Sequence, residues 1–284
     1  MAIVVVQQFF SVILPLDNSR PLAVMAFCKG AAMMKRKSVA MFNSRGFFSS
    51  IPTVTKNLLI INILMWVATL ALGGKVDLDK YLGLHYWEAS DFNVAQFITY
   101  MFMHANFSHL FFNMFSLFMF GIILERALGP GRYLFYYISC GIGAALVQEV
   151  VWTFTWIDVL KLGDQNGFVA LQGQEALNYL LQYNVPELER FFNIFVTIGA
   201  SGAVFGLLLA FAMLFPNMPM YLFFIPIPIK AKWMVIGYGL LELAFGVTGA
   251  QSTVAHFAHL GGMLFGFFII WYWKKKGVVG GGFY

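Results

Sequence analysis

Long apolar runs separated by short polar segments dominate the amino-acid sequence. A run of about 20 mainly apolar residues is long enough to cross a bilayer as a helix, so each run predicts a membrane-spanning helix. Six such runs occur, at residues 57–73, 102–124, 131–154, 194–215, 231–250 and 254–273. The proline-rich segment 216–228 cannot continue a helix and therefore separates the fourth run from the fifth. The pattern predicts an all-α polytopic membrane protein with six transmembrane helices.

Composition supports this fold class and limits the partners. Hydrophobic residues make up 60% of the 284 residues and charged residues 11%, which is rare in a soluble domain. The formal net charge is +5, but the bases flank the apolar runs and form no basic face, so no nucleic-acid partner is predicted. Cys28 and Cys140 lie far apart in the sequence and predict neither a disulfide framework nor a cysteine metal site.

The positions of lysine and arginine predict the orientation in the membrane. Bases precede the first run, follow the last run at Lys274, Lys275 and Lys276, and occur in the connections after the second and fourth runs. The connection 155–190 instead carries five acids and two bases. Because cytoplasmic connections are enriched in Lys and Arg, we expect both termini in the cytoplasm and 155–190 on the opposite side. The membrane we expect is a bacterial inner membrane.

The chain is expected to divide into three parts. Residues 1–50 form a cytoplasmic N-terminal segment, 51–276 a single six-helix domain and 277–284 a short tail. The apolar stretch 3–16 is short for a span and lacks the positive start of a signal peptide. Met41 begins a stretch that continues into the first span, so an upstream mis-assigned start is an equally good interpretation of residues 1–40.

Polar residues gather near the ends of three apolar runs. They are Ser201 in the fourth run, His256 and His259 in the sixth, and His104, His109 and Asn113 in the second. Polar side chains within a bilayer are costly and usually face the protein interior, where many are functional. Histidine is the usual base that activates a serine hydroxyl, so a serine and a histidine on two helices can form a catalytic dyad. Position alone leaves both His256 and His259 open.

Glycines supply the close helix contact that such a dyad needs. Gly202 and Gly206 are four residues apart, as are Gly262 and Gly266. Small residues at this spacing let two helices pack backbone to backbone. His259 shares a helix face with Gly262 and Gly266, because the three positions follow i, i+3 and i+7 spacing. The imidazole of His259 is therefore expected to point at the fourth helix.

An acyl-transfer enzyme also needs hydrogen-bond donors for the negative oxygen of its intermediate. His109 and Asn113, at i and i+4, share one helix face, and the N–H of Ser201 near a helix start has no acceptor within the helix. Taken singly, each feature has a plainer interpretation as helix packing or as a structural hydrogen bond. Their occurrence together on three helices favours a catalytic site.

In these residues the chain resembles the rhomboid family of intramembrane serine proteases. Residues 199–202 resemble the family's nucleophile motif, which implies that Ser201 is the nucleophile. Residues 258–266 resemble its Ala-His-x-x-Gly-x-x-x-Gly helix, which implies that His259 is the general base and that His256 is outside the dyad. In this resemblance Gly202, Gly262 and Gly266 belong to the structural motif.

The resemblance extends to the second helix. Residues 104–113 resemble the family's second-helix motif, which implies that His109 and Asn113, with Gly199, line the oxyanion and substrate site and that His104 is structural. Glu125, between Gly121 and Gly129, is implied to hold a polar network. One departure concerns the first loop, where Ala95 and Gln96 stand in place of a Trp-Arg pair that many members carry.

The function implied by this resemblance is a serine endopeptidase that cleaves peptide bonds in or near transmembrane segments. No cofactor, metal or acidic third member of the dyad is implied; the partners are membrane-protein substrates and the lipid bilayer, and the oligomeric state is open. One alternative is a proteolytically inactive rhomboid-like protein that binds membrane clients. Another is a transporter or channel, which would use carboxylates near the midplane, and only Glu149 and Glu242 are candidates.

Overall fold

The structure, a computed structural model, describes residues 47–164, 189, 192–222, 225–248 and 255–279. This part contains six long helices: α5 (Thr53–Leu72), α8 (Phe107–Leu128), α9 (Pro130–Asp164), α12 (Ser201–Leu214), α13 (Ala231–Thr248) and α14 (His256–Lys275). They follow the order of the six predicted runs. The predicted N-terminal segment 1–50 lies mostly outside the described residues, and the connection 155–190 and the tail 277–284 lie partly outside them.

Three of these helices are long and apolar enough to cross a membrane by length and composition. They cover Thr53–Leu72, Phe107–Leu128 and Pro130–Thr155, and α12 is a shorter apolar helix. The predicted class, a helical polytopic membrane protein, is confirmed, whereas the count of six spans stays a prediction. Apolar side chains of α5 such as Leu64 and Leu70 point outward, 60% and 63% exposed, as a lipid-facing helix requires.

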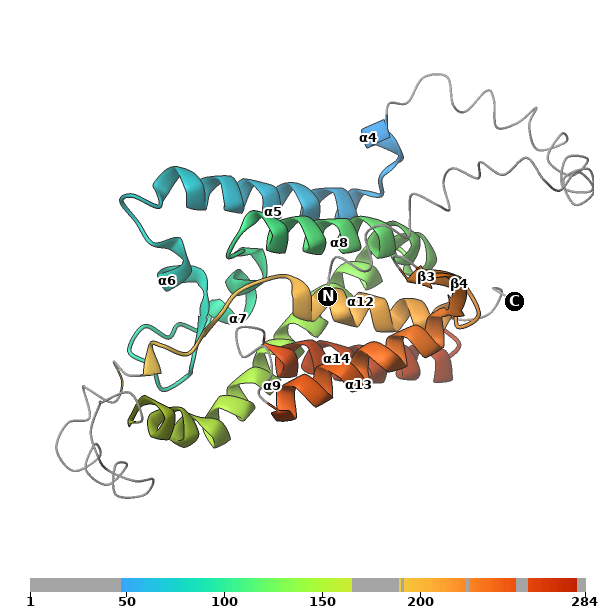
Figure 1. Cartoon of the computed structure of the whole chain (residues 1–284). Helices are drawn as coiled ribbons and strands as arrows, with labels where there is room; N and C mark the ends of the chain where they lie inside the picture. Colours follow the sequence, from blue (N-terminus) through green and yellow to red (C-terminus); the bar gives the residue numbers. More distant parts are fainter. Residues whose placement is uncertain (1–46, 165–188, 190–191, 223–224, 249–254, 280–284) are drawn as a thin grey trace, which may run out of the picture.

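Short elements lie at the two ends of the bundle (Figure 1). At one end are α6 (Leu78–Leu82), α7 (Gln96–Thr99), the 3₁₀ turn η1 (Tyr100–Phe102), and the antiparallel strands β1 (Leu84–His85) and β2 (Val196–Thr197). At the other end β3 (Pro219–Leu222) pairs with β4 (Ile225–Lys230), and the short helix α4 covers Phe47–Ser50. Hydropathy did not predict these strands. Prolines are tolerated in β3 and β4 because both are edge strands.

Two helices, α8 and α12, begin more than one turn after the start of their apolar runs. The α8 helix begins at Phe107, because the side chain of Asn106 accepts a hydrogen bond from the N–H of His109 (2.9 Å) and caps the helix. The α12 helix begins at Ser201, since residues 196–197 pair as a strand with residues 84–85. The fourth run therefore enters the bundle as extended chain and becomes helical at the serine.

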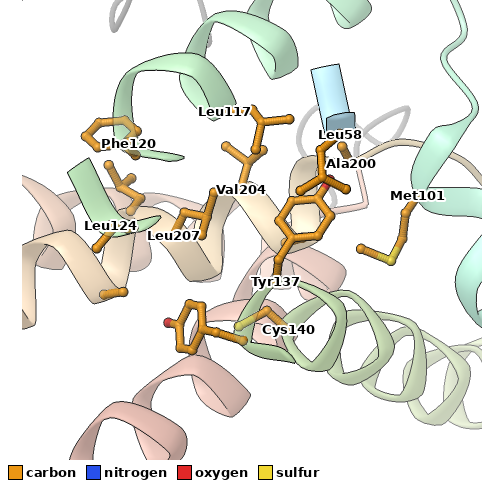
Figure 2. Packing of buried hydrophobic residues seen from close by; sticks show 14 of the residues in the cluster. Leu58, Met101, Leu117, Phe120, Leu124, Tyr137, Cys140, Ala200, Val204 and Leu207 are labelled. Atoms are coloured by element: carbon orange, nitrogen blue, oxygen red, sulfur yellow. The ribbon is translucent and has the colours of Figure 1, made fainter. Parts of the chain in front are cut away.

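Apolar side chains of α8, α9 and α12 form the core between the helices (Figure 2). Leu117 and Leu124 of α8, Tyr137 and Cys140 of α9, and Leu207 of α12 are all fully buried. Hydrogen bonds add to this packing, because the hydroxyl of Tyr136 donates to the carbonyl of Gly206 (2.7 Å). The α9 helix is thereby joined to α12 near the middle of the bundle.

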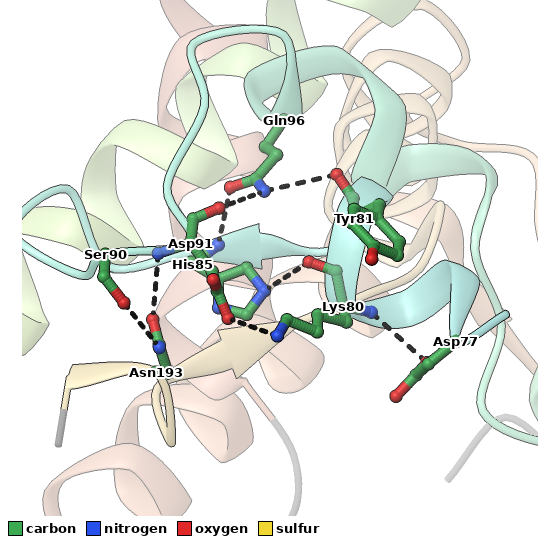
Figure 3. A network of polar contacts seen from close by, with 8 residues as sticks. All are labelled: Asp77, Lys80, Tyr81, His85, Ser90, Asp91, Gln96 and Asn193. Carbon is green, nitrogen blue, oxygen red and sulfur yellow. Dashed lines mark hydrogen bonds and ion pairs between the residues drawn. The ribbon is translucent and has the colours of Figure 1, made fainter. Parts of the chain in front are cut away.

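Gln96 holds the first loop at the place where the sequence departs from the family pattern (Figure 3). Its side-chain oxygen accepts from the N–H of His85 (3.2 Å), and its amide nitrogen donates to the carbonyls of Asp91 (2.9 Å) and Tyr81 (3.3 Å). The residue is 1% exposed. Three hydrogen bonds from one buried amide join separate parts of the loop, so Gln96 supplies a different means of ordering it.

The same loop is tied to the chain that leads into α12. Asn193 accepts from the N–H of Asp91 (3.1 Å) and donates to the hydroxyl of Ser90 (2.8 Å), as Figure 3 shows. Asp91 also pairs with Lys80 at 3.3 Å, but this ion pair is partly exposed and contributes little. The loop and the approach to Ser201 thus share one polar network.

Candidate active site

A tight turn places Ser201 at the start of α12. Gly199 has φ +129°, which favours glycine, and its N–H donates to the carbonyl of Tyr100 (2.9 Å). The Tyr100 hydroxyl in turn donates to the carbonyl of Gly141 in α9 (2.7 Å). A Cβ at Gly199 would stand 2.7 Å from ring atoms of His109. Glycine is therefore required at this position by its conformation and by the nearby imidazole.

Ser201 and His259 meet across α12 and α14. The Nε2 atom of His259 lies 2.8 Å from the Oγ atom of Ser201, at hydrogen-bond distance. The ring of Phe205 stacks on the imidazole, with centroids 4.2 Å apart and planes 8° apart. Phe205 was missed by the sequence reasoning, although its position four residues after the serine puts it on the same helix face. The stacked ring leaves the imidazole little freedom to turn.

Glycines allow this approach of the two helices. A Cβ at Gly262 would overlap the backbone carbonyl of Gly202, so α14 and α12 touch through their backbones here. Gly206 lies beside both Cys140 and the carbonyl of Gly262, and Gly266 lies against Tyr136 of α9. The glycines thus serve two contacts, one between α12 and α14 and one with α9.

A buried carboxylate from α13 completes the surroundings of His259. The Oε2 atom of Glu242 lies 3.0 Å from Nδ1 of His259 and 2.6 Å from Nδ1 of His256. All three residues are buried, with Glu242 2% exposed. Sequence reasoning assigned no acid to the site, because Glu242 stands on another helix, 17 positions before His259. The available signal was a carboxylate within an apolar run.

The second-helix residues take different positions. The ring of His109 lies beside Gly199 and 5.1 Å from the ring of His104, which is buried. Asn113 is also buried, and its amide nitrogen donates to the carbonyl of His109 in its own helix (3.0 Å). The structure therefore brings His109 to the turn before Ser201, whereas the amide of Asn113 is engaged within α8.

Glu125 joins α8 to the start of α5. Its Oε1 accepts from the N–H of Val54 (2.9 Å), and its Oε2 accepts from the N–H (2.7 Å) and the hydroxyl (2.8 Å) of Thr55. The first N–H groups of a helix have no acceptor within it, and a negative charge is favourable there. The neighbouring Arg126 donates to the carbonyl of Ser50 (3.0 Å). Glu125 caps α5 from a second helix.

Glu125→Ala is expected to destabilise the protein strongly. The change leaves the half-buried N–H of Val54 and two buried donors of Thr55 without their acceptor, and an unmet buried donor costs about 1–3 kcal/mol. Thermal unfolding in detergent measures the effect, with the exposed Glu88→Ala as the matched control. An unfolding temperature equal to that of the control would contradict the capping role.

These observations define a helical membrane protein in which a half-buried serine and a buried histidine are in contact between two helices. The family model described as the Rhomboid domain matches residues 91–276. The chain belongs to the rhomboid family, as the motifs in the sequence predicted, and it is an integral membrane protein.

Part of the chain is similar in sequence to several curated rhomboid proteins. The chain is 28% identical over 174 residues to Rhomboid protein 1, mitochondrial, of Saccharomyces cerevisiae, covering 61% of this chain and 40% of that protein. It is 30% identical over 174 residues to the putative rhomboid protease YdcA of Bacillus subtilis, covering 61% and 63%. For the rhomboid protease AarA of Providencia stuartii the identity is 28% over 178 residues, covering 58% and 51%.

The chain thus matches about two fifths to three fifths of the length of these relatives. Similar proteins also include the chloroplastic Rhomboid-like protein 11 of Arabidopsis thaliana. Because the relatives come from bacteria, mitochondria and chloroplasts, a bacterial inner membrane with both termini cytoplasmic stays a prediction.

Proposed function

We propose that this chain is an intramembrane serine endopeptidase that uses Ser201 and His259 as a catalytic dyad. The observation that carries the proposal is the 2.8 Å contact between Oγ of Ser201 and Nε2 of His259, which joins two helices at the two family motifs. A base at hydrogen-bond distance is what a serine needs to become a nucleophile. Several relatives of the chain bear the name rhomboid protease.

The reaction follows from the positions of these atoms. Oγ of Ser201 attacks the peptide carbonyl while Nε2 of His259 takes the hydroxyl proton. The imidazolium then protonates the leaving amine, and an acyl-enzyme remains on Ser201. Water, activated by the same histidine, hydrolyses the ester and restores the serine. The site lies at the end of α12 that faces the first loop, which we assign to the non-cytoplasmic side, from which water enters.

The negative oxygen of the intermediate needs donors near Ser201. Ser201 is the first residue of α12, so its N–H has no acceptor within the helix. The imidazole of His109 lies beside Gly199, two residues before the serine. We assign these two groups to the oxyanion site, with Asn113 joining them when its amide turns from the carbonyl of His109.

Substitution of His109 or Asn113 is expected to lower turnover without abolishing it. Loss of one oxyanion donor costs about 10²–10³ in other acyl-transfer enzymes, and here the N–H of Ser201 remains in every variant. His109→Ala should therefore lower kcat more than Asn113→Ala, and the double variant should lower it most. Turnover and unfolding temperature are measured together. An Asn113→Ala variant with unchanged turnover on every substrate removes Asn113 from the site.

The substrates we propose are membrane proteins with a single span, cut within or next to that span. Helix-destabilising residues near the cleaved bond would help, because a stable helix keeps the peptide carbonyl hydrogen-bonded. Purified protein in liposomes is incubated with such a substrate and with a fluorophosphonate probe. Cleavage and labelling of Ser201 support the proposal. Absence of both across several substrates and lipids favours the alternative, an inactive rhomboid-like protein that binds membrane clients.

A further inference from the structure

Glu242 places one carboxylate oxygen between two histidines. Oε2 lies 3.0 Å from Nδ1 of His259 and 2.6 Å from Nδ1 of His256, and the opposite nitrogen of His259 lies 2.8 Å from Oγ of Ser201. The acid comes from α13, the histidines from α14 and the serine from α12. Side chains from three helices therefore form a continuous chain of hydrogen-bond contacts from Glu242 through His259 to Ser201.

The protonation pattern follows from the number of donors. An ionised carboxylate only accepts hydrogen bonds, so both short contacts to Oε2 require an N–H on Nδ1 of each histidine. A protonated Oε2 could instead donate to one Nδ1 and accept an N–H from the other. We assign the ionised form, because two imidazoles at hydrogen-bond distance from one oxygen stabilise its negative charge when both donate to it. With its proton on Nδ1, neutral His259 presents the lone pair of Nε2 to the serine hydroxyl. This tautomer is the one that a general base needs.

The three side chains also contain the donors of a metal site, because one ligand atom from each lies within 4.8 Å of the others. The distances favour hydrogen bonds. Ligands about 2.0–2.1 Å from a tetrahedral zinc ion stand about 3.3 Å apart, whereas the oxygen and the nitrogen of His256 are 2.6 Å apart. Nε2 of His259 is in addition engaged with Ser201.

We propose that Glu242 is a positioning residue that acts through His259. It holds the proton of His259 on Nδ1, orients the ring toward Ser201, and stabilises the imidazolium that forms when the serine transfers its proton. His256 donates to the same oxygen and fixes the carboxylate from the other side, with its ring 5.5 Å from that of Phe245. The catalytic part of this inference rests on the proposed function.

The tautomer is tested by nuclear magnetic resonance, without any need for activity. Protein labelled with ¹⁵N-histidine in detergent micelles is compared with Glu242→Gln and Glu242→Ala, and the ring signals are assigned with His256→Gln and His259→Gln. We expect the Nδ1–H form of His259 in the wild type and its loss in Glu242→Ala. The proposal is overturned if the proton of neutral His259 is on Nε2 in the wild type. It is also overturned if the tautomer of His259 is the same in Glu242→Ala as in the wild type.

Kinetics test the consequence for catalysis. Glu242→Gln keeps the shape and removes the charge, and we expect kcat to fall about 10²- to 10⁴-fold with little change in KM, as for the orienting acid of other serine proteases. Glu242→Asp should restore part of kcat because it restores the carboxylate. The matched control is Glu149→Gln in α9, whose buried carboxylate accepts from the N–H of Trp87 in the first loop (2.9 Å).

The outcomes separate the two proposals. If Glu242→Gln keeps kcat within about threefold of the Glu149→Gln control, Glu242 has no positioning role in catalysis. The same conclusion follows if Glu242→Gln lowers only the unfolding temperature and leaves both kcat and the tautomer unchanged. If the wild type neither cleaves nor reacts with the probe, yet the Nδ1–H of His259 depends on Glu242, the proposed function fails and the positioning of His259 stands.

Discussion

Ser201→Ala and His259→Ala are each expected to abolish cleavage while leaving the unfolding temperature close to that of the wild type. Ser201→Ala loses one hydrogen bond, that between Oγ of Ser201 and Nε2 of His259. His259→Ala also loses the contact between Nδ1 and Oε2 of Glu242, but that oxygen keeps His256 as a partner. A nucleophile and its base act as a unit, so loss of either lowers turnover by at least about 10⁴-fold in serine proteases. Cleavage of a single-span substrate in liposomes measures the effect.

His256→Ala provides the matched comparison, since this histidine is on the same helix and touches the same carboxylate. No contact joins His256 to Ser201 among the described residues, so its removal is expected to cost far less turnover than removal of His259. Probe labelling of Ser201 should follow the same order. An inactive His256→Ala beside an active His259→Ala would reverse the assignment of the base.

Hydropathy and short motifs were enough to predict the order of the long helices and part of the candidate site. The six apolar runs match the six long helices in order, because a long apolar run in a chain with few charges leaves the backbone few alternatives to a helix. Ser201, His259 and the glycines around them follow local spacings that can be read along one helix. The approach of α12 and α14 could be predicted for that reason.

Features that depend on contacts between distant segments were not predictable in this way. The start of α12 is set by strand pairing between residues 196–197 and 84–85, which are far apart in the sequence. Glu242 reaches His259 from another helix, and no spacing rule connects them. In the sequence, Gln96 stands at the place of a Trp-Arg pair that many family members carry. In the structure its buried amide makes hydrogen bonds with three backbone groups of the first loop. Each case needed the tertiary arrangement.

The close contact between α12 and α14 suggests a second large effect, from a single added methyl group. Gly262→Ala places a Cβ against the carbonyl of Gly202, and a backbone atom cannot rotate away as a side chain can. The helices must separate, and overpacking of this kind costs about 1–3 kcal/mol. Because His259 lies one turn before Gly262, the separation also lengthens its contact with Ser201.

We therefore expect Gly262→Ala to lower the unfolding temperature and the turnover together. Gly237→Ala on α13 is the control, because a Cβ there meets nothing within 4 Å and alanine favours a helix by about 1 kcal/mol over glycine. The control should be as stable as the wild type or more so, with turnover unchanged. Thermal unfolding in detergent and cleavage in liposomes are measured for both variants. If the two variants behave alike, backbone contact at Gly262 is not what sets the distance between His259 and Ser201.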